Sequence, residues 1–302
     1  MTRTCAIIIT ACGLAASGSA LAQPASAPAT APAETLLNRI GKIEHPAISE
    51  SSGIVASRRH QGVFWTHNDG GNPPVLYAID QTGRLIGEFP VAAENIDWED
   101  IAIDDAGNLY IADIGNNLAD RNQVLVHRVA EPNPRARLLP GFTRTPLRVT
   151  ATWRLNYPDA PFDAEALFVH EGFGYIISKL RSGRAASLYR FSLAATAEPQ
   201  VLQRVAAVPI RSPVTAGDIS ADGRTLAVLS VTGLSLFRIE GDPLSVERAA
   251  SIFLPHIHAM QEGCCFMPEG VLVTNEHRDV LLFRTRDLAF SAHQPTERPQ
   301  DR

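Results

Sequence analysis

Asp97-Trp98-Glu99-Asp100-Ile101 opens a run of short apolar segments, and four other stretches of the chain open similar runs. These stretches are Glu50-Ser51-Ser52-Gly53-Ile54, Asp163-Ala164-Glu165-Ala166-Leu167, Thr215-Ala216-Gly217-Asp218-Ile219 and Met260-Gln261-Glu262-Gly263-Cys264. Their third residues stand at positions 52, 99, 165, 217 and 262, which gives steps of 47, 66, 52 and 45 residues. Self-similarity at such a period indicates a repeat architecture.

Each opening stretch begins a β-strand that further strands follow. Short apolar runs alternate with Gly, Asn and Asp turns, and no long stretch has the 3.6-residue period of a helix. Third strands are expected at Val75–Ile79, Val124–Val129, Ser187–Phe191 and Leu234–Ile239. Four strands per step match one propeller blade. The sequence therefore predicts an all-β protein, a β-propeller of five four-stranded blades, or of six if the Pro-rich stretch 131–146 hides a degenerate blade.

The last module is too short to be complete. Only 40 residues follow Glu262, and the chain from about residue 291 is polar, so a fourth strand is missing there. The stretch 36–43 near the front of the chain is an unassigned strand that can take this place and close the ring, which removes the exposed sheet edges. The expected propeller domain spans 35–290, and a disordered polar tail spans 291–302.

The first 22 residues have the anatomy of an export signal. Arg3 precedes an apolar run from Cys5 to Ala16, and Ala20-Leu21-Ala22 is a small-residue cleavage site. The run is too short to span a bilayer, so no transmembrane segment is expected. Residues 23–34 are rich in Pro and Ala and are expected to form a disordered linker. The expected location is periplasmic or secreted, and a lipoprotein anchored through Cys12 is the rival interpretation.

The composition excludes several classes of protein. With 302 residues, 45% of them hydrophobic, the chain can bury a core, so wholesale disorder is excluded. The 27 basic and 32 acidic residues give a net charge of -5, which leaves no basic excess for binding a nucleic acid. We expect a monomer that binds a small-molecule or extended ligand.

One end of the predicted propeller gathers polar side chains. The first strand of each blade lines the central channel and the second runs antiparallel to it, so the start of the first and the end of the second emerge at the same mouth. The residues expected to line a ligand there are Glu50, Asn68, Asp69, Asp100, Asp113, Lys179, Asn275, Glu276 and His277. Lys179, one of only two lysines, can neutralise Asp163 and Glu165 or bind an anionic substrate.

Two pairs of carboxylates at this mouth predict a metal site. Asp97 with Glu99, and Asp163 with Glu165, stand two residues apart, which on a strand turns both carboxylates to one side. Carboxylates crowded in a narrow channel take up protons, pair with cations or bind a metal. Oxygen ligands suit calcium, and the predicted ligands are Asp97, Glu99, Asp163, Glu165, Asn116 and Glu262. In the alternative interpretation the carboxylates accept backbone N–H bonds and only hold loops together.

Acid–base chemistry is assigned to three residues of the same mouth. Glu99, Glu165 and His67 are the predicted catalytic residues, because a histidine near paired carboxylates can act as a general base. His277 follows the second strand of its module as His67 does, whereas His256 and His258 are expected to be ordinary loop residues.

The tryptophans and cysteines leave alternatives open. Trp65 and Trp98 can stack on a ligand or pack between blades. Cys264 and Cys265 can close a vicinal disulfide in an oxidising compartment or remain buried free thiols.

The segments 51–54, 97–102, 113–117 and 163–166 together resemble bacterial secreted β-propeller proteins of uncharacterised type. More distantly, the chain is similar to the phytase-like esterase, NHL-repeat and gluconolactonase or paraoxonase propellers. The resemblance covers residues 40–290 and implies the fold more than an activity. We expect an exported propeller whose acidic mouth binds calcium and hydrolyses an ester, a lactone or a phosphoester. The alternative is a non-catalytic periplasmic or cell-surface propeller for binding or scaffolding.

Overall fold

The computed structural model describes residues 37–136, 143–194, 197–256 and 260–284. All of them belong to one compact unit, Thr35–Arg302. The export signal and linker predicted for 1–34, and the tail predicted for 291–302, lie outside these residues. The one helix in the described ranges is a short 3-10 turn, η1 (Pro243–Arg248), and none there is long and apolar enough to cross a membrane.

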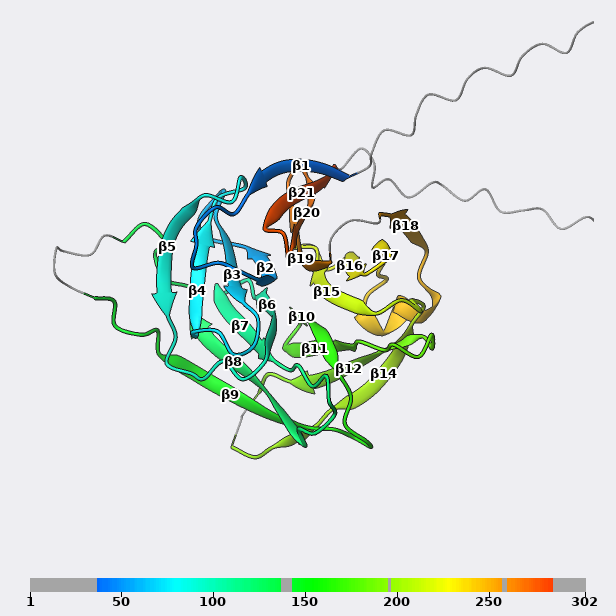
Figure 1. Ribbon diagram of the computed structural model, residues 1–302. Helices are drawn as coiled ribbons and strands as arrows, with labels where there is room; N and C mark the ends of the chain where they lie inside the picture. The colour runs from blue at the N-terminus through cyan, green and yellow to red at the C-terminus, as the bar shows by residue number, and fades with distance from the viewer. Residues whose placement is uncertain (1–36, 137–142, 195–196, 257–259, 285–302) are drawn as a thin grey trace, which may run out of the picture. The chain divides into compact units, whose positions relative to one another are not determined.

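Five mainly antiparallel sheets form the blades of a β-propeller (Figure 1). Blade 1 consists of β2 (Ser51–Ala56), β3 (Phe64–Asn68), β4 (Val75–Ile79) and β5 (Leu85–Pro90). Blade 2 consists of β6 (Trp98–Ile103), β7 (Asn108–Asp113), β8 (Gln123–Ala130) and β9 (Val149–Asn156), with β13 (Gln200–Val201) paired parallel to β9. Blade 3 consists of β10 (Ala164–His170), β11 (Phe173–Ser178), β12 (Ala186–Ser192) and β14 (Gln203–Val208). The first strand of each blade lies nearest the axis in Figure 1.

The remaining two blades complete the ring and confirm the predicted fold class. Blade 4 consists of β15 (Val214–Ile219), β16 (Thr225–Ser230), β17 (Gly233–Arg238) and β18 (Ser251–Pro255). Blade 5 consists of β19 (Gln261–Met267), β20 (Gly270–Asn275), β21 (Asp279–Arg284) and β1 (Leu37–Lys42). Strand β1 pairs antiparallel with β21, with Leu37 opposite Phe283 and Lys42 opposite Asp279. The N-terminal strand therefore supplies the fourth strand of the last blade, as the sequence predicts.

The described residues of the long step between the second and third modules form no sixth blade. Strands β8 and β9, of eight residues each, pair directly from Gln123 opposite Asn156 to Val129 opposite Val149, and the extra length forms the connection between them. In the described parts of that connection, 131–136 and 143–148, Leu147 makes an isolated bridge to Val91 of blade 1 and no further sheet forms.

Apolar side chains fill the space between neighbouring blades, because both faces of every sheet are buried. Five clusters of buried residues lie between blades 1 and 2, 2 and 3, 3 and 4, 4 and 5, and 5 and 1. Trp65 and Trp98 belong to the cluster between blades 1 and 2, and both are 0% exposed. Of the two roles considered for these tryptophans, the structure assigns packing between blades.

The axis of the propeller is filled rather than open. Asp100 of β6 is fully buried, and its carboxylate accepts N–H bonds from Ile101 at 2.9 Å, from Leu167 of blade 3 at 2.9 Å and from Gly217 of blade 4 at 3.3 Å. A Cβ on Gly53 of β2 would lie 2.7 Å from the Cα of Asp100, so a glycine is needed for this close approach of β2 and β6. Three blades are thus tied together at the centre by one side chain.

Candidate functional site

A β-bulge recurs at the start of the first strand of every blade. The pairing of the first and second strands shifts between Ser51 and Gly53, Trp98 and Asp100, Ala164 and Ala166, Val214 and Ala216, and Gln261 and Gly263. The extra residue is therefore Ser52, Glu99, Glu165, Thr215 or Glu262. A bulge leaves its extra residue unpaired and turns that side chain in a new direction. The fold thus presents one equivalent side chain per blade, three of them acidic, at one end of the propeller.

The structure corrects the sequence alignment of blade 4. The sequence repeat puts Gly217 at the position of Ser52 and Glu99, whereas the bulge is at Thr215, two residues earlier. Asp218 consequently lies deeper in its strand, where its carboxylate accepts a 2.8 Å hydrogen bond from the N–H of Phe266 in blade 5. Asp218 and Asp100 both connect blades by accepting backbone N–H bonds. This agrees with the alternative interpretation, in which such carboxylates hold the backbone and bind no metal.

A cavity of about 410 Å³, called the mouth pocket below, opens where the bulges lie. Six carboxylates and two basic side chains line it. The complete lining is Ser49, Glu50, Ser51, Ser52, Asp69, Glu99, Asn117, Glu165, Lys179, Arg181, Met260, Glu262, Glu276 and His277. The structure therefore brings together most of the acids predicted for this mouth, from blades 1, 2, 3 and 5.

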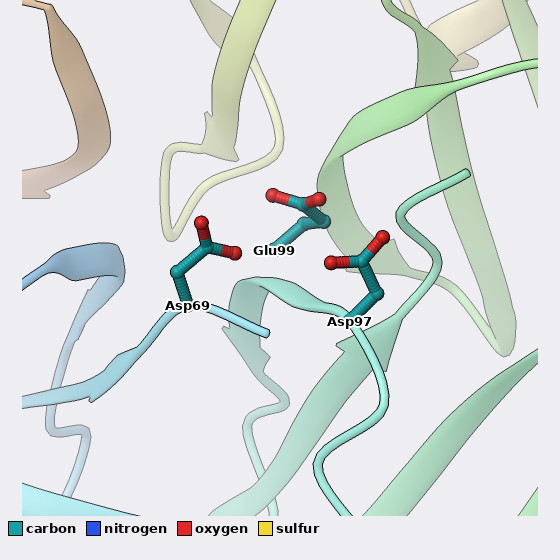
Figure 2. A group of neighbouring side chains, drawn as sticks. All are labelled: Asp69, Asp97 and Glu99. Atoms are coloured by element: carbon teal, nitrogen blue, oxygen red, sulfur yellow. The ribbon is translucent and has the colours of Figure 1, made fainter. Parts of the chain in front are cut away.

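One group of carboxylates joins blade 1 to blade 2. Oxygens of Asp69, Asp97 and Glu99 all lie within 4.8 Å of one another, and Figure 2 shows the three side chains pointing toward a common space. Asp69 follows the end of β3, where its N–H donates to Glu50 O at 3.2 Å. Asp97 precedes β6, and its N–H donates to Asp113 Oδ1 at 3.2 Å. No Lys, Arg or His of the described residues forms an ion pair with Asp69, Asp97 or Glu99.

A second group joins blade 2 to blade 3 and shares Glu99. Oxygens of Glu99, Asp163 and Glu165 also lie within 4.8 Å of one another. Lys179, directly after β11, forms an ion pair with Oε1 of Glu165, and its backbone N–H donates to Asp163 O at 2.8 Å. Oε2 of Glu165 is buried and has no hydrogen-bond partner among the described residues. One oxygen of Glu165 is thus held by the lysine and the other is uncommitted.

Crowding and burial shift the titration of these groups. Burial, followed by the charge of Glu165, raises the pKa of the Glu99 carboxyl well above its ordinary value. Burial also raises the pKa of Glu165 to about 8, against the opposing effect of Lys179. The pKa of Glu262 is raised to about 7 and that of Asp97 to about 6, in both cases mainly by burial. Without a cation, the mouth pocket would therefore hold protons near neutral pH.

Lys179 keeps its charge in this environment. Burial alone would lower its pKa, but the neighbouring carboxylates, Glu165 first, raise it above the ordinary value. The structure therefore supports the first of the two roles considered for Lys179, the neutralisation of Glu165.

Asn116 and Asp113 support the pocket from outside it. Asn116 does not line the cavity, and its amide oxygen accepts the N–H of Arg121 at 3.0 Å while its amide nitrogen donates to Tyr157 Oη at 2.9 Å. The metal-ligand role predicted for Asn116 is thereby replaced by a structural one. Asp113 is fully buried and forms an ion pair with Arg121 at 2.8 Å. Its Oδ1 also fixes the backbone of Asp97, so Asp113 positions a member of the first carboxylate group without lining the cavity itself.

His67 is absent from the mouth pocket, contrary to its predicted catalytic role. It is 0% exposed, its Nδ1 lies 3.0 Å from Asn68 O, and its ring packs edge-on against Trp98 with 5.6 Å between centroids. Burial lowers the pKa of His67 to about 4. The bulge in β2 explains the error, because it places His67 opposite Gly53 and not opposite Ser52. A neutral, enclosed imidazole there has no access to a ligand in the cavity.

Two predicted ligand-lining amides are also structural. Asn68 accepts the N–H of Glu50 at 3.2 Å and donates to Ala47 O at 2.7 Å. Asn275 accepts the N–H of Asp279 at 2.8 Å. Asp100 fills the axis as described above and does not line the cavity. These three residues hold the backbone that carries the pocket side chains.

The cysteines are free thiols on opposite faces of β19. Cys264 packs in the apolar cluster between blades 4 and 5, and Cys265 packs in the cluster between blades 5 and 1. Successive side chains of a strand point to opposite faces, so the vicinal disulfide considered from the sequence does not form. Burial raises the pKa of both thiols well above their ordinary value. His256 packs against Phe283 and does not line the cavity, and His258 lies outside the described residues.

Six residues of the lining were not assigned to the site from the sequence: Ser49, Ser51, Ser52, Asn117, Arg181 and Met260. Arg181 and Met260 have the largest side chains among them. Arg181 is exposed and donates to Asn117 Oδ1 at 3.1 Å, which connects the blade 3 and blade 2 loops over the cavity. Met260 is 45% exposed and precedes the bulge of blade 5 by two residues, as Glu50 precedes that of blade 1. Only the spacing from Lys179 and from Glu262 could have indicated them.

Comparisons with known proteins find only distant structural similarity. No protein-family model and no curated protein matches the sequence. A chain of hydrazine synthase from Kuenenia stuttgartiensis is 12% identical with a TM-score of 0.41, over 75% of this chain and 56% of that one. A gluconolactonase from Xanthomonas campestris is 13% identical with a TM-score of 0.43, over 73% and 67%. A chain of a nidogen/laminin complex is 11% identical with a TM-score of 0.45, over 79% and 84%. This chain thus spans a little over half the hydrazine synthase chain. Identities this low say nothing about activity.

Proposed function

We propose that the mouth pocket binds a divalent cation between Asp69, Asp97 and Glu99, and that this cation is calcium. The proposal rests on three carboxylates whose oxygens gather within 4.8 Å without an ion pair to a described basic residue. Calcium binds oxygen ligands at about 2.3–2.6 Å, so two oxygens on one ion are separated by at most about 5 Å. Carboxylate oxygens of flexible side chains suit calcium better than magnesium, which demands near-ideal octahedral geometry.

Cation binding would also relieve the electrostatic cost of the pocket. The charged forms of Asp97 and Glu99 are disfavoured by burial and by their acidic neighbours, as their raised pKa values indicate. A divalent ion favours the charged forms and displaces the protons. Calcium affinity should therefore rise as the pH increases through about 6, the pKa of Asp97, and beyond it, because the raised pKa of Glu99 keeps a competing proton there at higher pH.

Thermal melting and calorimetric titration with calcium test the proposal. For an extracellular module we expect a dissociation constant of about 10⁻⁴–10⁻³ M. Calcium should raise the melting temperature and EDTA should reverse the shift. Asp97→Asn should weaken binding at least about tenfold, whereas Asp105→Asn, an exposed residue in the turn after β6, is the matched control and should have no effect. No response of the wild-type protein to calcium or EDTA would refute the proposed site.

A hydrolytic activity on an ester, a lactone or a phosphoester is the enzymatic form of the same proposal. The observation that favours it is the uncommitted Oε2 of Glu165, which belongs to a residue that lines the cavity beside the proposed cation position. The cation would supply a Lewis acid for the substrate carbonyl or phosphoryl oxygen. Glu165 would take the proton of the attacking water, and a pKa of about 8 lies in the range suited to proton transfer near neutral pH.

A panel of aryl ester, lactone and phosphoester substrates, assayed with calcium, tests this form. Wild-type protein should turn over one class, and Glu165→Gln should lose about 100-fold or more of the rate. Equal rates in the two proteins would remove Glu165 from the chemistry. Calcium binding without turnover of any class would favour a binding or scaffold propeller.

A further inference from the structure

Two groups of carboxylates border the mouth pocket, which Asp69, Glu99 and Glu165 line, and they differ in how their charge is balanced. The group of Asp69, Asp97 and Glu99 has no ion pair with a described basic residue. The group of Glu99, Asp163 and Glu165 has the same spread of oxygens, within 4.8 Å, but contains the ammonium of Lys179 on Glu165. The two groups share Glu99, so they lie next to each other.

Lys179 is held in place from both of its ends. Its backbone N–H donates to Asp163 O at 2.8 Å, which fixes the main chain of Lys179 against the second group. Its side chain is 9% exposed and its ammonium is attracted by Glu165, Glu262 and Glu99. An ammonium so enclosed by carboxylates provides one tethered positive charge where a bound ion would otherwise be needed.

The second group still has an unused ligand atom. Glu165 is 3% exposed and lines the cavity, and its Oε2 is buried without a hydrogen-bond partner in the part of the chain that the structure describes. A buried carboxylate oxygen without a partner is costly, so such an atom points to a ligand. The lysine therefore satisfies only half of the carboxylate.

We propose that Lys179 occupies the place of a second divalent cation, so that the pocket binds a single calcium ion and removal of the ammonium converts it into a two-ion site. This inference rests on the proposed calcium site at Asp69, Asp97 and Glu99. Glu99 would then bridge the two ions, in the way that one carboxylate can in two-metal sites with ions about 3.5–4 Å apart. The charge of Lys179 repels an ion at the second position and thereby sets the stoichiometry.

Calcium stoichiometry in wild type and Lys179→Met tests the inference, measured by isothermal titration calorimetry and by metal analysis after desalting. We expect one ion in the wild type and two in Lys179→Met, with an additional calcium-induced rise in melting temperature in the variant. Arg181→Met is the matched control, because Arg181 lines the same cavity and pairs with Asn117 instead of a carboxylate. It should keep one ion.

The outcomes separate this inference from the proposed function. A wild type that binds no calcium would refute both. One ion in the wild type together with one or none in Lys179→Met would overturn the inference and leave the calcium site standing, and so would two ions in the wild type. Should Lys179→Met fail to fold, Lys179→Gln is measured in its place. Failure of both variants to fold in calcium would also overturn the inference, since the second ion should replace the ammonium.

Discussion

The substitution Gly115→Ala should damage the calcium site while leaving the fold almost intact. Gly115 follows β7, and its N–H donates to Asp97 O at 3.2 Å. A Cβ there would lie 2.2 Å from Oε1 of Glu99 and 2.3 Å from Oδ2 of Asp97. Relief to an ordinary separation moves each carboxylate by about 1 Å. Both are the ends of flexible side chains, so the backbone need not move and the apo protein should lose less than about 1 kcal/mol.

The effect on calcium binding should be much larger. A shift of about 1 Å breaks at least one calcium–oxygen bond of about 2.3–2.6 Å, and we expect at least tenfold weaker binding, or about 1.4 kcal/mol. At calcium of about 100 times the wild-type dissociation constant, stabilisation should fall from about 2.7 to about 1.4 kcal/mol. For a domain of this size, that difference removes roughly 3–5 °C from the calcium-induced shift in melting temperature.

Gly62→Ala provides the control for this experiment. Gly62 lies in the turn between β2 and β3, and no described atom lies within 4 Å of a Cβ there, although its φ of +70° makes the substitution strained. The strain should lower the melting temperature equally with and without calcium, so the calcium-induced shift should match that of the wild type. An unchanged shift in Gly115→Ala, or the same loss in Gly62→Ala, would refute the assignment of Asp97 and Glu99 to the ion.

Three further predictions concern the framework. Asp100→Ala should lower the free energy of unfolding in urea by about 3 kcal/mol, because it leaves backbone N–H groups of two other blades unpaired at the axis; a loss under about 1 kcal/mol would contradict this role. Burial raises the pKa of Asp218 to about 6 from 3.8, so the folded protein retains a proton that the unfolded chain releases, and stability should fall as pH rises from about 4 to 6, by roughly 3 kcal/mol. Asp218→Asn should lack this component in urea melts across that range, and a constant difference from wild type would count against it. Trp65→Phe removes the indole N–H that donates to Glu131 Oε1 at 2.7 Å and should lower the free energy of unfolding by about 1–3 kcal/mol. Adding Glu131→Leu should recover most of this loss in the double variant; losses that simply add would contradict the role of this hydrogen bond.

The blades were predictable because each blade has to bury both faces of a four-stranded sheet, which gives every blade the same sequence pattern. Both faces of every sheet are covered by neighbouring blades, so apolar runs such as Leu226–Leu229 recur between polar turns at a period that the sequence reveals. The missing fourth strand of the last module likewise pointed to β1. These features depend on local pattern and chain length alone.

The site was predictable only in part, because bulges and long-range hydrogen bonds decide which side chains face the cavity. Six of the predicted acids line the cavity, as expected from their place at the starts of first strands and the ends of second strands, whereas Asp100 and Asp113 do not. The bulge in β2 places His67 opposite Gly53, where its ring is buried. The bulge in β15 makes Thr215, and not Gly217, the blade 4 equivalent of Glu99. The role of Asn116 depends on Tyr157, 41 residues away in the sequence, and no local pattern reports that contact.

The pairing of β1 with β21 has a consequence for biogenesis. Leu37 pairs with Phe283, and the ribosome synthesises Phe283 246 residues after Leu37. A nascent chain therefore carries an unpaired strand edge until β21 has been synthesised, and the last sheet can be completed only after that strand has emerged. Loop closure over such a distance is slow, so the pairing of β1 with β21 should be a late step of folding. Before this step the exposed strand edges should make the chain most prone to aggregation.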